Sequence, residues 1–189
     1  MEFPEKQYQA YLYDCDGTLA DTMAAHVETW VEELARHGCH VEKELFYELA
    51  GMPGPKTVLE INRRFHLALP PQEVSDQKEE LFYQKYLHRI EPIHSVVEHL
   101  KKMSVHAKIA VVSGGKKKVV QETLKIIGVA HLVQALVCSE DVKEGKPSPE
   151  PFLMAAKLLG IAPEHCLVIE DADFGVRAAI AAGMDYIKV

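Results

Sequence analysis

Residues 11–21 read Tyr-Leu-Tyr-Asp-Cys-Asp-Gly-Thr-Leu-Ala-Asp, so two carboxylates, Asp14 and Asp16, follow directly on a short apolar run. The run is typical of a buried strand, and the glycine behind it is typical of a turn. Burying a charged carboxylate is destabilising unless a cation or hydrogen bonds compensate the charge. The segment therefore indicates a strand whose end holds a cation and a reactive carboxylate. Asp21 lies where a helix would begin, and we expect it to cap that helix.

The composition limits the classes of protein to consider. A chain of 189 residues, 48% of them apolar, fits one compact domain or one domain with a small inserted subdomain. The formal net charge of −7 argues against a general binder of nucleic acids or anionic membranes. No apolar run approaches the roughly 20 residues of a membrane span, the first residues lack a secretory pattern, and the four cysteines form no CxxC pair. We therefore predict a monomeric cytoplasmic protein that binds neither nucleic acid nor membrane.

Short apolar segments alternate with helical patterns along most of the chain. Five segments with little polar alternation are typical of strands covered on both faces: 9–13, 108–112, 135–138, 166–169 and 186–189. Helical patterns lie between them at about 95–102, 116–127, 149–159 and 174–182. Glycines follow three of these helical patterns, as is usual where a helix ends: Gly128, Gly160 and Gly183. The alternation predicts an α/β fold with a parallel sheet.

The segment from residue 22 to about residue 89 departs from this alternation. It contains amphipathic helical segments, broken at Gly38, at residues 51–55 and at Pro70-Pro71, and no clear strand. A crossover between parallel strands needs far fewer residues. We therefore predict a helical subdomain inserted after the first strand, over the strand ends where the sites of α/β proteins lie.

A polar signal follows four of the predicted strands. In chain order the signals are Asp14 with Asp16, Ser113-Gly114-Gly115-Lys116, Gly145-Lys146-Pro147 and Glu170-Asp171. Because parallel strands end at one edge of a sheet, we expect the four signals to meet there. Two acidic pairs beside a hydroxyl and an ammonium describe an oxygen-lined cation site next to an anion site. Hard oxygen ligands, without Cys or His, favour Mg²⁺.

These residue types suit phosphoryl transfer. The carboxylate of Asp14, at the strand end, can attack phosphorus and form an acyl phosphate. Asp16 can give a proton to the leaving oxygen and later take one from water. Lys146 would offset charge around the nucleophile and the transferring group. Glu170 and Asp171, together with Asp14, would hold Mg²⁺, which screens the repulsion between a carboxylate and a phosphate dianion.

An anion site is expected beside these carboxylates. Ser113 and the backbone N–H groups of Gly114 and Gly115, at the start of a helix, can bind phosphate oxygens. Taken alone, Ser113 also fits an ordinary helix N-cap. We interpret Asp173 as part of an acidic first helical turn and not as a ligand.

Taken in order, the segments DCDGTLAD, VVSGG, GKPSP and EDADFGV resemble the four motifs of the haloacid dehalogenase (HAD) superfamily, and the resemblance covers essentially the whole chain. The place of the insert resembles the helical cap of the β-phosphoglucomutase-like subfamily. Within that subfamily, EDADFGVRAAIAAGMD is most similar to fructose-1-phosphate and 6-phosphogluconate phosphatases. Cys15 stands where the family usually has Met, Phe or Leu, and we expect a small buried residue there.

The resemblance carries structural and chemical expectations. It implies a Rossmann-like HAD core with a parallel sheet at residues 1–21 and 90–189, and a small all-α cap at residues 22–89. It also implies a two-step transfer through a phospho-aspartate, with Mg²⁺ required. The backbone carbonyl of Asp16, rather than its side chain, would then join Asp14, Glu170 and Asp171 at the metal.

The predicted cap contains further candidates for substrate binding. His26 and Trp30 lie four residues apart on one helix face and match a His and a Trp near the substrate in the resembling enzymes. In the alternative, Trp30 packs in the cap core and His26 is exposed. Lys56 stands where the mutases have an Arg that grips a distal phosphate, and lysine is a point charge rather than a bidentate fork. Lys78 matches a cap lysine of the family. Lys116 resembles a phosphate contact, although it also fits a solvated helix face.

The sequence therefore predicts a Mg²⁺-dependent phosphatase that hydrolyses small phosphorylated metabolites, above all sugar phosphates, through an aspartyl phosphate. The main alternative is a mutase of the β-phosphoglucomutase type, which returns the phosphoryl group to a second hydroxyl. Lys56 in place of the expected Arg argues against the mutase. A non-catalytic sensor of phosphorylated metabolites is a further alternative, and the intact set of chemical residues argues against it.

Overall fold

The computed structural model describes residues 6–189 and has a five-stranded sheet at its centre, with strand order β5-β4-β1-β6-β7. All four neighbouring pairs are parallel. The strands are β1 (Ala10–Tyr13), β4 (Lys108–Val112), β5 (Ala135–Val137), β6 (Cys166–Glu170) and β7 (Asp185–Lys188). Each predicted strand is present with its ends shifted by one residue at most, and the predicted α/β class is confirmed.

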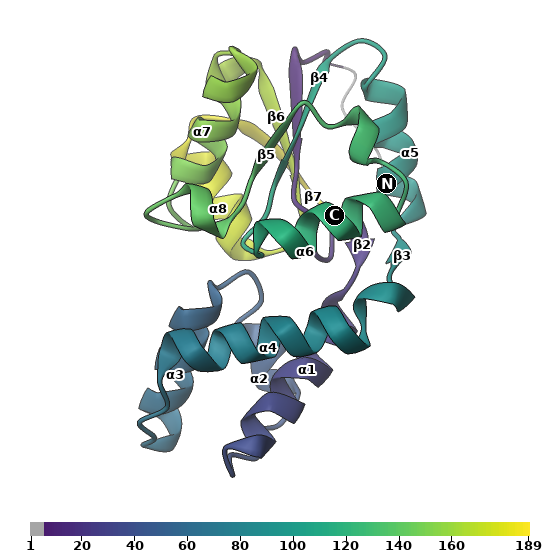
Figure 1. Cartoon of the computed structure of the whole chain (residues 1–189). Coiled ribbons are helices and arrows are strands. Elements are labelled where there is room, and N and C mark those ends of the chain that lie inside the picture. The colour runs from purple at the N-terminus through teal and green to yellow at the C-terminus, as the bar shows by residue number, and fades with distance from the viewer. Residues whose placement is uncertain (1–5) are drawn as a thin grey trace.

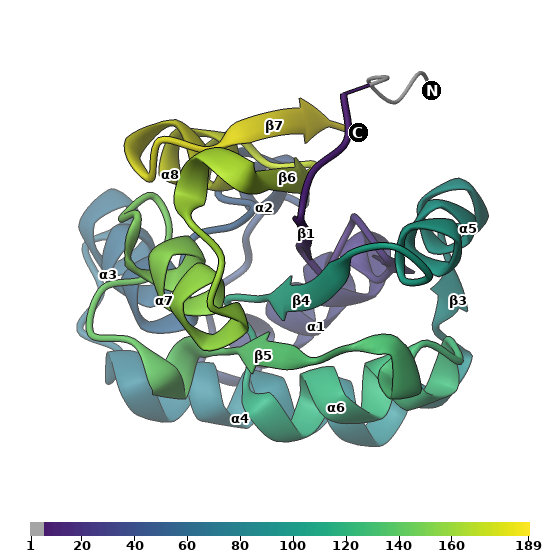
Figure 2. The ribbon, with the colours of Figure 1, turned by 90° about the horizontal axis from the view of Figure 1, so that it is seen from above.

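Helices cover both faces of this sheet. They are α5 (His94–Met103), α6 (Lys117–Ile126), α7 (Glu150–Leu159) and α8 (Asp173–Ala181), with short 3₁₀ turns at Ala130–Leu132, Ser139–Asp141 and Pro163–His165. Because side chains alternate along a strand, Tyr11 and Tyr13 pack with α5 and α6, whereas Ala10 and Leu12 pack with α7 and α8. Figure 2 shows α7 and α8 on the side of the sheet opposite α5. Both faces of β1, β4 and β6 are buried, which explains their apolar runs. The expectation of two covered faces is wrong for β7, which lies at the edge of the sheet and is mostly exposed.

The residues between the first strand and α5 form a separate group of helices beyond the carboxyl ends of the strands (Figure 1). They are α1 (Met23–Arg36), α2 (Glu44–Glu48), α3 (Gly54–Phe65) and α4 (Pro71–Lys85), followed by the 3₁₀ turn η1 (Leu87–Arg89). They enclose an apolar cluster of their own, which includes Trp30, Phe46 and Ile61. Of the helices in residues 6–189, none is long and apolar enough to cross a membrane.

Two very short strands connect the helical group to the sheet. β2 (Ala20–Asp21) pairs antiparallel with β3 (Glu91–Pro92). They lie beside the predicted cap boundaries, at residues 22 and 89. Residues 1–5 of the predicted core segment lie outside the described part of the chain.

The expected helix cap at Asp21 is wrong. Asp21 lies in β2, opposite Glu91, and the N-cap position of α1 is Thr22. Thr22 makes no side-chain cap bond, because its hydroxyl donates to Asp16 Oδ1 at 2.9 Å. The chain thus stays extended one residue further than the pattern indicates. The expectation for Cys15 is confirmed, since its side chain is fully buried.

Candidate active site

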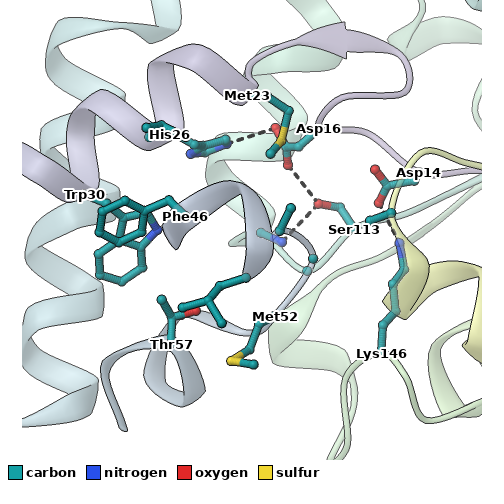
Figure 3. A pocket seen from close by; sticks show the side chains of 18 of the residues that line it. Asp14, Asp16, Met23, His26, Trp30, Phe46, Met52, Thr57, Ser113 and Lys146 are labelled. Atoms are coloured by element: carbon teal, nitrogen blue, oxygen red, sulfur yellow. Dashed lines mark hydrogen bonds and ion pairs between the residues drawn. The ribbon is translucent and has the colours of Figure 1, made fainter. Parts of the chain in front are cut away.

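The polar residues at the strand ends surround one cavity of about 130 Å³, which the helical group closes from the other side. All four predicted signals contribute to it. Its lining from the sheet side includes Asp14, Asp16, Ser113, Gly114, Lys146, Glu170 and Asp171. Figure 3 shows His26, Trp30, Phe46 and Thr57 on the opposite wall. The expectation that the four signals meet at one edge of the sheet is met.

Lys146 binds two of the carboxylates at the floor of the cavity. Its Nζ lies 2.6 Å from Asp14 Oδ1 and 2.6 Å from Glu170 Oε1, and it also donates to the carbonyl of Val112 at 3.0 Å. All three side chains are buried, with Lys146 5% exposed. Burial lowers the pKa of Lys146, but the two carboxylates outweigh it and hold the pKa above the usual value. Burial raises the pKa of Asp14 well above its usual range, although Lys146 opposes the shift.

Asp14, Glu170 and Asp171 form an acidic cluster. Each offers a carboxylate oxygen within 4.8 Å of the others. Thr18 donates its hydroxyl to Asp171 Oδ1 at 2.9 Å, and burial together with the charge of Glu170 raises the pKa of Asp171. Gly17, at φ +85°, leaves the space above this carboxylate open, because a Cβ there would lie 2.4 Å from Asp171 Oδ2. Three carboxylate donors, two of them buried and that of Asp171 half-buried, fit a hard cation such as Mg²⁺.

Asp16 points away from this cluster and toward the helical group. Its Oδ1 accepts hydrogen bonds from Thr22 at 2.9 Å and from His26 Nε2 at 3.1 Å, and its Oδ2 accepts one from Ser113 at 3.3 Å. Burial raises the pKa of Asp16, but His26 and Thr22 outweigh it and lower the pKa to about 2. The side chain is therefore ionised and does not belong to the cluster of Asp14, Glu170 and Asp171.

A chain of polar contacts leads from Asp16 into the helical group. Lys78 Nζ lies 2.7 Å from His26 Nδ1 and 2.9 Å from Glu79 Oε1. An ammonium can only donate, so His26 Nδ1 accepts the hydrogen bond from Lys78. The ring proton of His26 is then on Nε2, which donates a hydrogen bond to Asp16. The imidazole also stacks on Phe82, with ring centroids 4.0 Å apart. These contacts link the loop after β1, which holds Asp16, to His26 of α1 and to Lys78 and Glu79 of α4.

The remaining candidates divide between two spaces. Trp30 stacks on Phe46, with centroids 6.0 Å apart, and lines the cavity while it packs in the apolar cluster of the helices. Lys56 and Lys116 line an adjoining cleft of about 460 Å³ instead. Each bridges the helical group and the sheet domain through an ion pair, Lys56 with Glu144 at 3.1 Å and Lys116 with Asp76.

Three contributing residues were missed by the sequence analysis. Thr18 and Thr22 flank the acidic motif, but a hydroxyl beside an acid does not reveal which carboxylate it will bind. Glu79 follows Lys78 in a charged run that is typical of a solvated helix face. Only the packing of α4 against the strand ends places it at the cavity.

Comparisons with known proteins agree with this geometry. The profile of the haloacid dehalogenase-like hydrolase family matches residues 11–189. Fructose-1-phosphate phosphatase YqaB of Escherichia coli (strain K12) is 32% identical over 187 residues, which cover 97% of both chains. Hexitol phosphatase A of the same organism is 30% identical and covers 96% of this chain and 82% of its own length.

A solved structure shares the fold. CbbY from Rhodobacter sphaeroides, in complex with phosphate, superimposes with a TM-score of 0.85 at 24% identity and covers 96% of this chain and 86% of its own. Three findings lead to one conclusion. The family profile matches nearly the whole chain, two phosphatases are at least 30% identical to it, and a cavity lined by the motif residues lies at the strand ends. The chain belongs to the haloacid dehalogenase-like hydrolases, and it is a phosphatase.

Proposed function

We propose that this phosphatase is Mg²⁺-dependent and hydrolyses small phosphorylated metabolites, above all sugar phosphates, through an aspartyl phosphate on Asp14. The observation that carries the proposal is the cavity beneath the helices, which the ionised Asp16 lines together with the acidic cluster of Asp14, Glu170 and Asp171. The names of the two phosphatase relatives, which refer to fructose 1-phosphate and to hexitols, support a sugar or polyol phosphate.

In the first step, the carboxylate of Asp14 attacks phosphorus, and the bond from phosphorus to the leaving oxygen breaks. Asp16, once protonated, gives its proton to that oxygen, so the alcohol leaves neutral. Ser113 and the amide of Gly114 bind phosphoryl oxygens in this proposal. Lys146, which already contacts Asp14, offsets the negative charge that gathers during the transfer.

In the second step, water attacks the phosphorus of the aspartyl phosphate, and Asp16 takes the proton from that water. The acyl phosphate bond breaks, inorganic phosphate is released and Asp14 is regenerated. Residues 22–89 act as a cap that excludes bulk water during the first transfer. His26 and Lys78 of this cap position Asp16 through their hydrogen bonds.

Mg²⁺ fits the acidic cluster. The side chains of Asp14, Glu170 and Asp171 would hold it, together with the backbone carbonyl of Asp16. When bound, the ion supplies charge that screens the repulsion between a carboxylate and a phosphate dianion.

A panel of phosphate esters tests the proposal. After treatment with a chelator, the enzyme is expected to release inorganic phosphate from sugar phosphates only when Mg²⁺ is added. Turnover of β-glucose 1-phosphate to an isomer, without phosphate release, would instead identify a mutase. Binding of sugar phosphates without any turnover would identify a sensor.

We also propose that the enzyme acts as a monomer in the cytoplasm and has no nucleic-acid or membrane partner. The acidic net charge of −7 supports the absence of nucleic-acid and anionic-membrane partners. Size-exclusion chromatography with light scattering tests the oligomeric state, and a mass of twice the chain would contradict it.

A further inference from the structure

One buried oxygen of a residue that lines the cavity has no hydrogen-bond partner. Of the buried side-chain nitrogen and oxygen atoms in residues 6–189, Glu79 Oε2 is the one that makes no hydrogen bond. The other oxygen of the same carboxylate, Oε1, accepts from Lys78 Nζ at 2.9 Å. A buried acceptor without a donor is destabilising, so most native structures satisfy such atoms with protein, water or ligand.

The carboxylate of Glu79 is ionised. Burial raises its pKa, but the ammonium of Lys78 and the nearby His26 outweigh the burial and hold the pKa below its usual value. An ionised carboxylate can only accept hydrogen bonds. The partner that Oε2 lacks is therefore a donor, and a hydroxyl group supplies one without adding charge.

Glu79 lies at the junction of the two spaces. It lines both the cavity of about 130 Å³ and the adjoining cleft of about 460 Å³. From the helical group only Gly51 and Gly54 also line both, so Glu79 is the charged side chain of the helices at this junction. From the sheet side the shared residues are Ser113, Gly114 and Lys146, which belong to the proposed phosphoryl site.

The arrangement of the two spaces sets the path of a substrate. An ester whose phosphoryl group lies at Ser113 and Lys146, which line both spaces, can extend its leaving group through the junction into the cleft. The first carbons of the leaving group then pass Glu79. On an ester of a sugar or a polyol, these carbons carry hydroxyl groups.

We propose that Glu79 is a specificity-determining residue whose Oε2 accepts a hydrogen bond from a hydroxyl of the leaving group. The inference rests on the proposed phosphatase function and narrows its substrates to monoesters of sugars and polyols with a hydroxyl close to the ester oxygen. Esters of simple alcohols leave Oε2 unpaired in the complex and are poorer substrates, because a buried polar group without its partner discriminates strongly between ligands.

Two three-carbon esters that differ in their hydroxyl groups test this inference: glycerol 1-phosphate and n-propyl phosphate. In the native enzyme, kcat/KM for glycerol 1-phosphate is expected to exceed that for n-propyl phosphate by roughly tenfold or more. Glu79→Ala is expected to bring the two values to within about a factor of two to three of each other, because neither ester then finds an ionised acceptor. Glu79→Gln, which keeps the shape, gives an intermediate ratio and serves if the alanine variant does not fold.

The ratio of the kcat/KM values for the two esters distinguishes a change in specificity from general damage to the active site. Loss of the contact with Lys78 would slow both esters equally and leave their ratio unchanged. Glu80→Ala is the matched control, because Glu80 is the next residue of α4, is exposed and binds only Gln84 among the described contacts.

Two results would overturn the inference while the phosphatase stands: equal kcat/KM for both esters in the native enzyme, or an unchanged preference in Glu79→Ala. If the native enzyme released phosphate from no ester at all, the proposed function would fail, and this inference would fail with it.

Discussion

Lys146 Nζ donates a hydrogen bond of 2.6 Å to Asp14 Oδ1, although the two residues are 132 positions apart in the chain. The same ammonium lies 2.6 Å from Glu170 Oε1. One cation thus compensates two buried carboxylates and connects β1, β6 and the loop behind β5. Both the stability of the fold and the proposed reaction depend on this contact, because Asp14, the carboxylate it stabilises, is the proposed nucleophile.

Replacing this lysine should harm both properties. Lys146→Met keeps the aliphatic chain but leaves Asp14 and Glu170 without their cation, and we expect the free energy of unfolding to fall by about 3–5 kcal/mol at neutral pH. Phosphate release should fall by more than about a hundredfold. Denaturant unfolding in the presence of a chelator measures the first effect. Lys157→Met, on the exposed side of α7, is the control, and equal stability of the two variants would refute the prediction.

His26 and Lys78 should act as one unit on Asp16. Lys78 fixes the tautomer of His26, and His26 donates to Asp16, so loss of either breaks the same chain. We expect His26→Ala and Lys78→Ala each to lower kcat by about tenfold or more, and the double variant to be little slower than the slower single variant. A double-mutant cycle on kcat gives the answer. Effects that multiply would show that the two residues act independently.

Gly175 should tolerate no side chain. A Cβ at this position of α8 would lie 1.7 Å from Glu170 Oε1. Gly175→Ala must therefore displace Glu170 from Lys146, and we expect a loss of about 1–3 kcal/mol in stability together with weaker Mg²⁺ activation. Thermal unfolding and a Mg²⁺ titration of the activity measure the two effects. Arg177→Ala, an exposed position on the same helix, should change neither. A fully stable Gly175→Ala with normal activation would contradict the observed packing.

His99 should make the protein less stable in mild acid. Burial and, to a smaller extent, the charge of Lys102 lower the pKa of His99 from 6.5 to about 4, and its Nδ1 lies 2.8 Å from the hydroxyl of Tyr13. The unfolded chain therefore binds a proton as the pH falls through 6.5, whereas the folded chain stays neutral at this site until about pH 4. The stabilisation is complete above pH 6.5 and is lost between pH 6.5 and 4.

The variant His99→Gln isolates this effect. Its free energy of unfolding should depend less on pH between 6.5 and 4 than that of the native protein. His131→Gln, at an exposed position, should keep the native slope. Parallel curves for the native protein and His99→Gln would rule out His99 as the titrating group.

Much of the fold was predictable because the local sequence pattern of the strands agrees with their place in a parallel sheet. Four strands of the central sheet, β1, β4, β5 and β6, are apolar runs followed by a polar loop, and parallel strands must end at one edge. That geometry alone places Ser113, Lys146 and Glu170 near Asp14. β2 and β3 were not predictable from the sequence. Each is two residues long, which is too short to show a periodic pattern, and each is a strand only because it pairs with the other.

The contacts between the helical group and the sheet were less accessible from the sequence. Lys56 and Lys116 form ion pairs with residues 88 and 40 positions away, and no local pattern specifies such partners. Glu79 and Glu80 are alike as letters, yet only Glu79 faces the cavity. Which of the two is buried depends on the rotation of α4 against the strand ends, and the weak amphipathicity of this helix does not fix that rotation.

The central claim is that Asp14 carries the phosphoryl group. Asp14→Asn is expected to remain folded and to lose turnover. Asp16→Asn keeps the nucleophile but lacks both the acid of the first step and the base of the second, so a phosphoryl group from radiolabelled p-nitrophenyl phosphate, whose leaving group needs no proton, should accumulate on it.

Acid quench, hydroxylamine treatment and peptide mapping of Asp16→Asn form the most direct measurement. We predict a hydroxylamine-labile label on the peptide that contains Asp14, and no label in the Asp14→Asn variant. A label on another residue, or the absence of any covalent label while the native enzyme turns over the same ester, would contradict the account.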